Sequence, residues 1–282
     1  AKKRRARWRC LTERTPTSQR FAGRRVFDTD THLTMPNQYG TTPTGPGEYR
    51  EADTGLARPK DAATLIVVRG GNEPTILMGK RAATHRFMPN KFVFPGGRLD
   101  LIDQRLQVPG DLNATVMERL RKATRKEVTD RKLRGLALAA IRETFEETGL
   151  VVGRKASVLT KTRHPVWQSY LGHGVEPPLE QMDFIARAIT PPYRTRRFDT
   201  RFFLIHDQFI HNDPEQVMDA SGELNEIHWL TLEKARLLDL PAITRWVIDM
   251  VEVRIQLAPS RQIQQPASFV RFSQGGPISE AL

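Results

Sequence analysis

The segment 142–150 limits what this chain can fold into more than any other stretch of the sequence. It holds three glutamates, Glu143, Glu146 and Glu147, at spacings that a helix gathers on one face. At about 100° per residue, the opposite face carries apolar side chains such as Phe145. Like charges at this spacing repel one another. Two interpretations follow from these residues alone: a solvated acidic helix face, or oxygen ligands for a hard divalent cation such as Mg²⁺.

Two patterns resemble the two halves of the Nudix box. Residues 142–149 read Arg-Glu-x-x-Glu-Glu-x-Gly, and Phe94-Pro95-Gly96-Gly97 follows an apolar strand candidate. The resemblance to Nudix hydrolases implies the α/β class, as an α/β/α sandwich around a mixed sheet. It also implies hydrolysis of a diphosphate with Mg²⁺ or Mn²⁺, because such an ion activates water and neutralises charge on phosphate oxygens.

The resemblance assigns a role to each matching residue. Glu146 and Glu147 match the principal metal ligands, and Glu143 matches a further ligand or a base. Arg142 matches the arginine that orients a neighbouring glutamate by a charge-assisted hydrogen bond. Gly97 matches the glycine whose backbone carbonyl approaches the metal.

The segment between the two halves is much longer than in the usual box, and we place an insertion at 98–134. It is expected to form a loop followed by a basic helix near 115–126. Arg134 stands eight residues before Arg142, where the box has a glutamate. The sequence does not indicate which residue takes the place of that glutamate.

A second pattern, just before the box, resembles the motif of Nudix enzymes that cleave coenzyme A. It contains Arg81-Ala82, Arg86 and Phe94, with Asn90 where that motif has glycine. Asn tolerates the left-handed backbone better than most residues, so the turn is retained. Coenzyme A carries a pyrophosphate and a 3′-phosphate, and arginine binds phosphate through two hydrogen bonds. Arg81, Arg86 and Phe94 are therefore predicted to bind substrate; the alternative is that both arginines only flank a strand end.

Two segments after residue 190 resemble the later part of peroxisomal-type coenzyme A diphosphatases and their bacterial relatives. Arg197 and Arg201 are predicted to bind substrate from a loop that lines the cleft; the alternative is surface charges beside a strand. Glu223 or Glu226 is a candidate late catalytic carboxylate, with a salt bridge or a strand cap as the alternative role.

These motifs predict a metal-dependent hydrolase that cleaves the pyrophosphate of a nucleoside diphosphate derivative. Coenzyme A or an acyl-CoA is the first choice of substrate. An ADP-ribose or nucleotide-sugar diphosphatase is the alternative within the same chemistry. A non-catalytic Nudix domain that binds nucleic acid or regulates a partner is the alternative outside it.

Positive charge is concentrated at the start of the chain. The net charge is +12, and residues 1–25 hold ten Lys or Arg and one Glu. Such a segment suits contact with nucleic acid or an anionic surface, resembles an organellar transit peptide, or is a solvated extension. Met35 is a natural start position, so we hypothesise that residues 1–34 lie outside the folded enzyme. A native protein whose intact mass includes that segment would contradict this hypothesis.

The predicted boundaries are a basic, Gly/Pro-rich, disordered extension at 1–58, a hydrolase domain at 59–257 and a polar, loose tail at 258–282. Cys10 is the single cysteine, so no intrachain disulfide forms. No apolar run is long enough to cross a bilayer, and no apolar segment follows the basic start, as a secretory signal requires. We expect a cytoplasmic protein, or an imported one if residues 1–34 form a transit segment; the oligomeric state is left open.

Hydrophobic periodicity and turn residues predict the remaining elements. Strands are expected at 63–69, 75–81, 92–94, 183–190, 202–206 and 227–230. Helices are expected at 135–148, from a cap at Thr231 to about residue 238, and from a first helical position at Pro241. Gly149 is expected to end the first of these helices in the left-handed conformation.

Overall fold

The computed structural model describes residues 57–83, 89–122, 124, 127–158, 160–212, 224–273 and 276–282. The fold and the site are built from these residues. The predicted extension at 1–58 lies almost wholly outside them, and so do Arg86 and Glu223, two of the predicted site residues.

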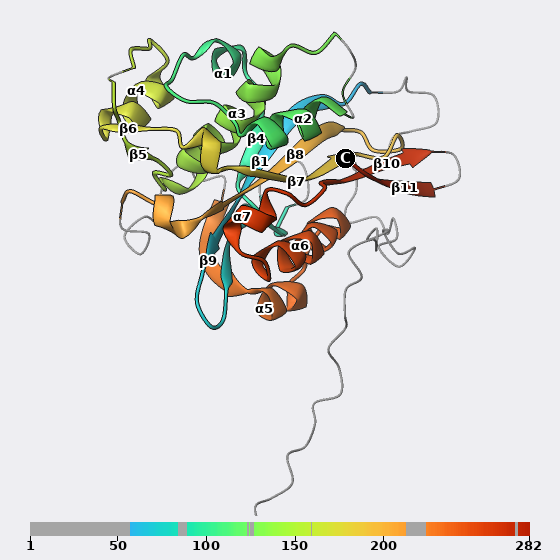
Figure 1. Cartoon of the computed structure of the whole chain (residues 1–282). Helices are drawn as coiled ribbons and strands as arrows, with labels where there is room; N and C mark the ends of the chain where they lie inside the picture. Colours follow the sequence, from blue (N-terminus) through green and yellow to red (C-terminus); the bar gives the residue numbers. More distant parts are fainter. Residues whose placement is uncertain are drawn as a thin grey trace, which may run out of the picture. The chain divides into compact units, whose positions relative to one another are not determined.

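A nine-stranded mixed sheet forms the centre of the fold (Figure 1). Its strands are β1 (Lys60–Arg69), β2 (Thr75–Arg81), β3 (Phe92–Val93), β4 (Gly96–Arg98), β7 (Asp183–Ile189), β8 (Phe198–His206), β9 (Leu224–Thr231), β10 (Ser268–Ser273) and β11 (Gly276–Ala281). The order is β11-β10-β7-β8-β1-β2-β3, with β4 paired to β1 and β9 paired to β2. β1 and β8 run parallel, and β2 is antiparallel to β1. All six predicted strands are present, and β8 and β9 are longer than expected.

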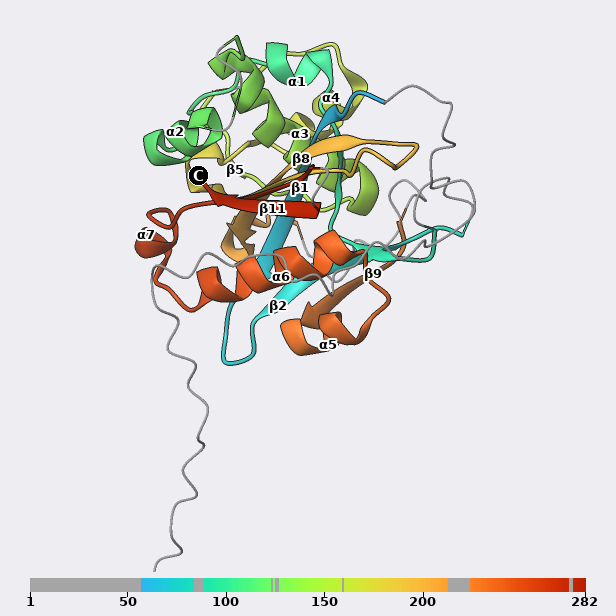
Figure 2. The ribbon, with the colours of Figure 1, turned by 90° about the vertical axis from the view of Figure 1, so that its right-hand side faces the viewer.

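Helices cover both faces of the sheet, as Figures 1 and 2 show. One face carries α1 (Leu101–Arg105), α2 (Ala114–Lys122), α3 (Asp130–Thr148) and α4 (Pro165–Gly172), and the other carries α5 (Leu232–Leu237) and α6 (Ala242–Ile255). This arrangement is the predicted α/β/α sandwich. Within the described residues, none of the helices combines the length and the hydropathy that crossing a membrane requires.

The central strand β1 shows how the sequence produces these layers. Leu65, Ile66, Val67 and Val68 are all at most 1% exposed. Leu65 and Val67 belong to the hydrophobic cluster on the α3 side, whereas Ile66 and Val68 belong to the cluster on the α6 side. A strand that is covered on both faces is a continuous apolar run rather than an alternating one.

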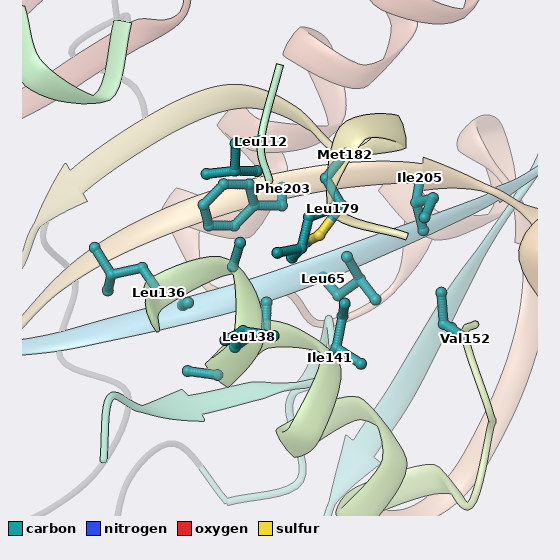
Figure 3. Close-up of a cluster of buried hydrophobic side chains, with 14 of the residues drawn as sticks. Leu65, Leu112, Leu136, Leu138, Ile141, Val152, Leu179, Met182, Phe203 and Ile205 are labelled. Atoms are coloured by element: carbon teal, nitrogen blue, oxygen red, sulfur yellow. The ribbon is translucent and has the colours of Figure 1, made fainter. Parts of the chain in front are cut away.

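Helix α3 is anchored to the sheet by its apolar face. Leu136, Leu138 and Ile141 are completely buried and lie in one cluster with Leu65 and Phe203 of the sheet (Figure 3). Leu138 and Ile141 lie on the face that the sequence places opposite the three glutamates, whereas Leu136 is about two helical turns before Glu143 and lies nearer the glutamate side. Packing against the sheet therefore turns the acidic face of α3 away from the core.

Both ends of α3 are capped. The helix begins earlier than predicted, because the hydroxyl of Thr129 accepts a hydrogen bond from the backbone N–H of Lys132. It ends where predicted: Gly149 has a φ of 69° and donates its N–H to the carbonyl of Phe145. A left-handed residue at this position is strongly favoured to be glycine.

The predicted helices near the C-terminus are also present. The hydroxyl of Thr231 accepts a hydrogen bond from the N–H of Lys234 and caps α5, as predicted. Pro241 is the N-cap of α6, so the helix begins at Ala242, one position after the expected first helical residue.

The expectation of a loose tail after Leu257 is wrong. Residues 259–262 form α7 (Pro259–Gln262), and the strands β10 and β11 extend the central sheet, with β10 parallel to β7. Phe269 and Val270 of β10 are 6% and 0% exposed. The polar residues around 260–266 concealed this short alternating strand, whose partner β7 lies far away in the sequence.

The predicted insertion contains two helices, and its basic helix is α2. This helix begins at Ala114, close to the expected position, and ends earlier than expected, at Lys122. Its Arg119 is 4% exposed and donates to Asp183 of β7 at 2.8 Å, while Arg254 of α6 donates to the same carboxylate at 2.9 Å. One buried carboxylate therefore joins helices from both faces of the sheet.

Replacing Asp183 with Asn is expected to lower the free energy of unfolding by about 3–5 kcal/mol, because two buried guanidinium groups lose their counter-charge. The matched control is Asp130→Asn, since Asp130 pairs with Arg121 on the surface, where both side chains are more than half exposed. Surface pairs contribute about 1 kcal/mol or less. Urea unfolding of both variants measures the difference; similar losses would contradict the structural role of the buried pair.

Candidate active site

The glutamates of α3 face a glycine turn at the start of β4. Glu147 is 5% exposed, and its Oε2 accepts a hydrogen bond of 2.9 Å from the backbone N–H of Gly96. Gly96 has a φ of 157°, and a Cβ there would meet the carbonyl oxygen of Ala63 and the side chain of Thr64 on β1. The close approach of this turn to β1 explains why glycine stands there.

Gly97 lies directly against the carboxylate of Glu143. A Cβ added at Gly97 would overlap the carboxylate carbon and both oxygens of that side chain. Any larger residue at this position displaces Glu143. The structure thus brings together the glycine and the glutamate that the sequence placed in two separate halves of a motif.

Arg142 is the centre of the cluster and is only 3% exposed. Its Nη1 donates to Glu146 at 2.6 Å, and its Nη2 lies 3.1 Å from an oxygen of Glu143. Nη2 also donates to the carbonyl oxygen of Arg98 at 3.0 Å, which connects the helix to β4. One guanidinium therefore fixes two of the three glutamates, in the geometry of the predicted orienting arginine.

Asp103 of α1 is a further residue of this site, and the motif resemblance gave it no role. It is completely buried and accepts hydrogen bonds from Nε of Arg142 at 2.9 Å, from Nη2 at 3.0 Å and from Nε1 of Trp167 at 3.1 Å. Burial lowers the pKa of Arg142, but the hydrogen bonds and the charge of the Asp103 carboxylate raise it by more. This guanidinium therefore stays charged. Arg134 instead donates to the carbonyl oxygens of Leu106 and Val108.

A signal for Asp103 was present in the sequence. It lies only six residues after Gly97, close to the glycine half of the motif, whereas counting eight residues back from Arg142 reaches Arg134. The long segment between the two halves of the motif hides the connection, because it separates the aspartate from its arginine.

The donor set fits a hard divalent cation by its chemistry. It consists of carboxylate oxygens, which are the ligands that Mg²⁺ and Mn²⁺ prefer. Burial and the neighbouring charge of Glu146 raise the pKa of Glu143 to about 7, against the opposing effect of Arg142. A cation relieves this repulsion. Among the described residues, no three His, Cys, Asp or Glu side chains form a group that is ready to hold an ion.

The three predicted substrate-binding residues that precede β4 differ in their placement. Arg81 is at the end of β2, next to a turn in which Asn90 has a φ of 59°, the left-handed conformation expected where the motif has glycine. Arg86 lies outside the described residues. Phe94 is 5% exposed and belongs to the core cluster on the α6 side, so its contacts are those of a packing residue.

The two later arginines have internal partners. Arg197 donates to the carbonyl oxygens of Thr190 and Ala57. Arg201 is 3% exposed and donates to Asp61 at 2.7 Å. The two alternatives were a loop residue that lines the cleft and a surface charge. Arg201 is buried, and its contacts are internal, so its position in the structure corresponds to neither. Substrate binding by these arginines stays a prediction that their contacts do not support.

Glu226 is exposed on β9, where it forms an ion pair of 3.0 Å with Lys80 and lies 3.4 Å from Nε2 of His228. This corresponds to the salt-bridge alternative. Glu223, the other candidate for a late catalytic carboxylate, lies outside the described residues.

Two known proteins that are similar to this chain are named as Nudix hydrolases. No family model matches the chain. The chain is 28% identical over 180 residues to "Putative nudix hydrolase 7" of Caenorhabditis elegans, a match that covers 60% of this chain and 50% of that protein. The chain thus spans about half the length of this curated relative. The crystal structure of a NUDIX hydrolase from Alicyclobacillus acidocaldarius is 26% identical, with a TM-score of 0.52, and the match covers 72% of this chain and 98% of that one.

The mixed sheet between two helical layers, with the glutamate-bearing α3 on one face, is the Nudix fold. Both similar proteins are named Nudix hydrolases, and this likeness agrees with the fold and with the glutamate-bearing helix of the chain.

Proposed function

We propose that this chain is a metal-dependent Nudix hydrolase that cleaves a diphosphate bond. The observation that carries the proposal is the buried guanidinium of Arg142, which holds Glu143 and Glu146 on the face of α3 that meets β4. Glutamates on a solvated helix face would not need a buried guanidinium to hold them. Fixing carboxylates by a buried arginine is the arrangement expected for groups that must keep one geometry during a reaction.

Each residue of the cluster has a place in the reaction. Glu146 and Glu147, with the backbone carbonyl of Gly97, would hold Mg²⁺ or Mn²⁺. The bound ion supplies charge neutralisation on the phosphate oxygens and a water of lowered pKa. With a pKa of about 7, the carboxylate of Glu143 is suited to accept a proton from the attacking water, or to act as a further ligand. Arg142 keeps the carboxylates in place.

For the substrate, we propose coenzyme A or an acyl-CoA, cleaved at the pyrophosphate to give a 3′,5′-adenosine bisphosphate and a phosphopantetheine. The local structure before β4 supports this choice. The N–H of Asn90 donates to the carbonyl oxygen of Arg81 at 3.2 Å, and the N–H of Arg81 donates to that of Lys91 at 3.0 Å. The left-handed Asn90 thus closes a turn that fixes Arg81 at the end of β2.

Hydrolysis of coenzyme A and of ADP-ribose, measured side by side with Mg²⁺, Mn²⁺ and EDTA, tests both parts of the proposal. We expect cleavage that EDTA abolishes and that favours coenzyme A. Arg81→Ala is expected to lower kcat/KM for coenzyme A about tenfold or more, the value of a charge-assisted hydrogen bond to phosphate.

Lys80→Ala is the matched control, because the neighbouring Lys80 pairs with the exposed Glu226. Cleavage of ADP-ribose alone would retain the chemistry and reject coenzyme A. Salt-sensitive RNA binding without hydrolysis of either compound, lost on deletion of residues 1–34, would support a binding domain instead.

A further inference from the structure

A polar cavity of about 380 Å³ opens beside the proposed active site. It lies where the N-terminal ends of β1 and α3 meet the segment that leads from β4 into α1. The charged residues that line it are Lys60, Asp61, Arg98, Asp100 and Lys132. None of them is among the residues that the sequence motifs assign to catalysis or binding.

Cations predominate in this cavity once the internal pairs are taken into account. Asp61 already has two cationic partners, Lys132 at 2.6 Å and Arg201 at 2.7 Å, so its negative charge is offset. The side chains of Lys60 and Arg98 are exposed, and neither forms an ion pair with any carboxylate in the described part of the chain. An anion that enters the cavity can therefore bind Lys60 and Arg98 without displacing a carboxylate from either side chain.

The cavity lies next to the segment that carries the glycine half of the site. Arg98 directly follows Gly97, whose backbone lies against Glu143. Nη2 of Arg142 is 3.1 Å from Glu143 and 3.8 Å from Asp100, so one guanidinium lies between the cluster and the cavity wall. Gly97 pairs with Ala63 on β1, and Lys60 is three residues away, about 10 Å along the strand. That separation suits two anionic groups on one nucleotide.

We infer that this cavity binds a second phosphate of the substrate, one that is not part of the cleaved diphosphate. The inference rests on the proposed function. A ribose phosphate next to the diphosphate, such as the 3′-phosphate of coenzyme A, has the required charge and reach. Arg98 provides the planar fork that binds phosphate with two hydrogen bonds, and Lys60 adds a point charge. The cavity thus selects substrates by a phosphate that the reaction leaves intact.

The test compares coenzyme A with 3′-dephospho-coenzyme A, using the full chain. The wild-type protein is expected to show a kcat/KM about tenfold or more higher for coenzyme A, as one charge-assisted hydrogen bond provides. Arg98→Ala and Lys60→Ala are expected to reduce this ratio toward one. Arg271→Ala is the matched control, because Arg271 lies on β10 and pairs with the exposed Glu280. Its ratio should equal that of the wild type.

A ratio that Arg98→Ala and Lys60→Ala leave unchanged would overturn the inference, as would equal use of both substrates by the wild type. If neither compound is hydrolysed, the proposed function fails, and binding then tests the cavity separately. Calorimetry should show tighter binding of adenosine 3′,5′-bisphosphate than of adenosine 5′-monophosphate, and Arg98→Ala should remove the difference. Equal affinities in the wild type would reject the cavity as a phosphate site.

Discussion

Replacing Glu147 with Gln is expected to lower kcat by about a thousandfold, the loss expected when several kcal/mol of metal-assisted stabilisation is removed. The amide keeps the size of the side chain and one oxygen that can accept the hydrogen bond from Gly96. It removes the negative charge that a divalent cation requires. The variant should therefore fold normally and bind Mn²⁺ more weakly. Steady-state kinetics, Mn²⁺ titration and thermal unfolding measure the three quantities.

Glu118→Gln is the control for this variant. Glu118 lies on α2, is 67% exposed and pairs with Lys122 on the same helix. The same chemical change there should leave kcat, Mn²⁺ affinity and the melting temperature unaltered. A folded Glu147→Gln protein with near-normal turnover would reject the assignment of Glu147 as a metal ligand.

The elements of this fold that the sequence predicts best are those with strong local signals. The continuous apolar run of β1, the spacing of the α3 glutamates and the left-handed Gly149 each follow from neighbouring residues. The C-terminal strand β10 was missed, because its short apolar pattern gains its meaning only from pairing with the distant β7. β10 therefore forms a strand because of long-range pairing rather than because of local propensity.

The candidate site shows the same division. The sequence brought Gly97 and Glu143 together correctly, because a motif connects them. It did not indicate the burial of Arg201, which depends on Asp61 and Asp199. A buried charge is acceptable only with partners, and partners from distant segments leave no periodic trace in a sequence.

Asp103 is the clearest example of such a partner, and its replacement by Asn gives the second large expected effect. The neutral amide leaves the guanidinium of Arg142 buried beside a group that presents its own N–H donors. Breaking a buried pair in this way costs about 3–5 kcal/mol of stability. Arg142 then no longer holds Glu143 and Glu146 in one geometry, so Mn²⁺ affinity is expected to fall about 10–100-fold, as for other residues that orient metal ligands.

Two comparisons separate this positioning role from a general loss of structure. Asp103→Glu retains the negative charge and should recover part of the Mn²⁺ affinity, although its longer side chain strains the buried site. Asp111→Asn is the matched control, since Asp111 is 63% exposed and its contact with Arg134 is 3.6 Å long. It should change neither stability nor metal binding. Normal Mn²⁺ affinity in a destabilised Asp103→Asn protein would restrict Asp103 to a structural role and leave Arg142 dependent on its glutamates alone.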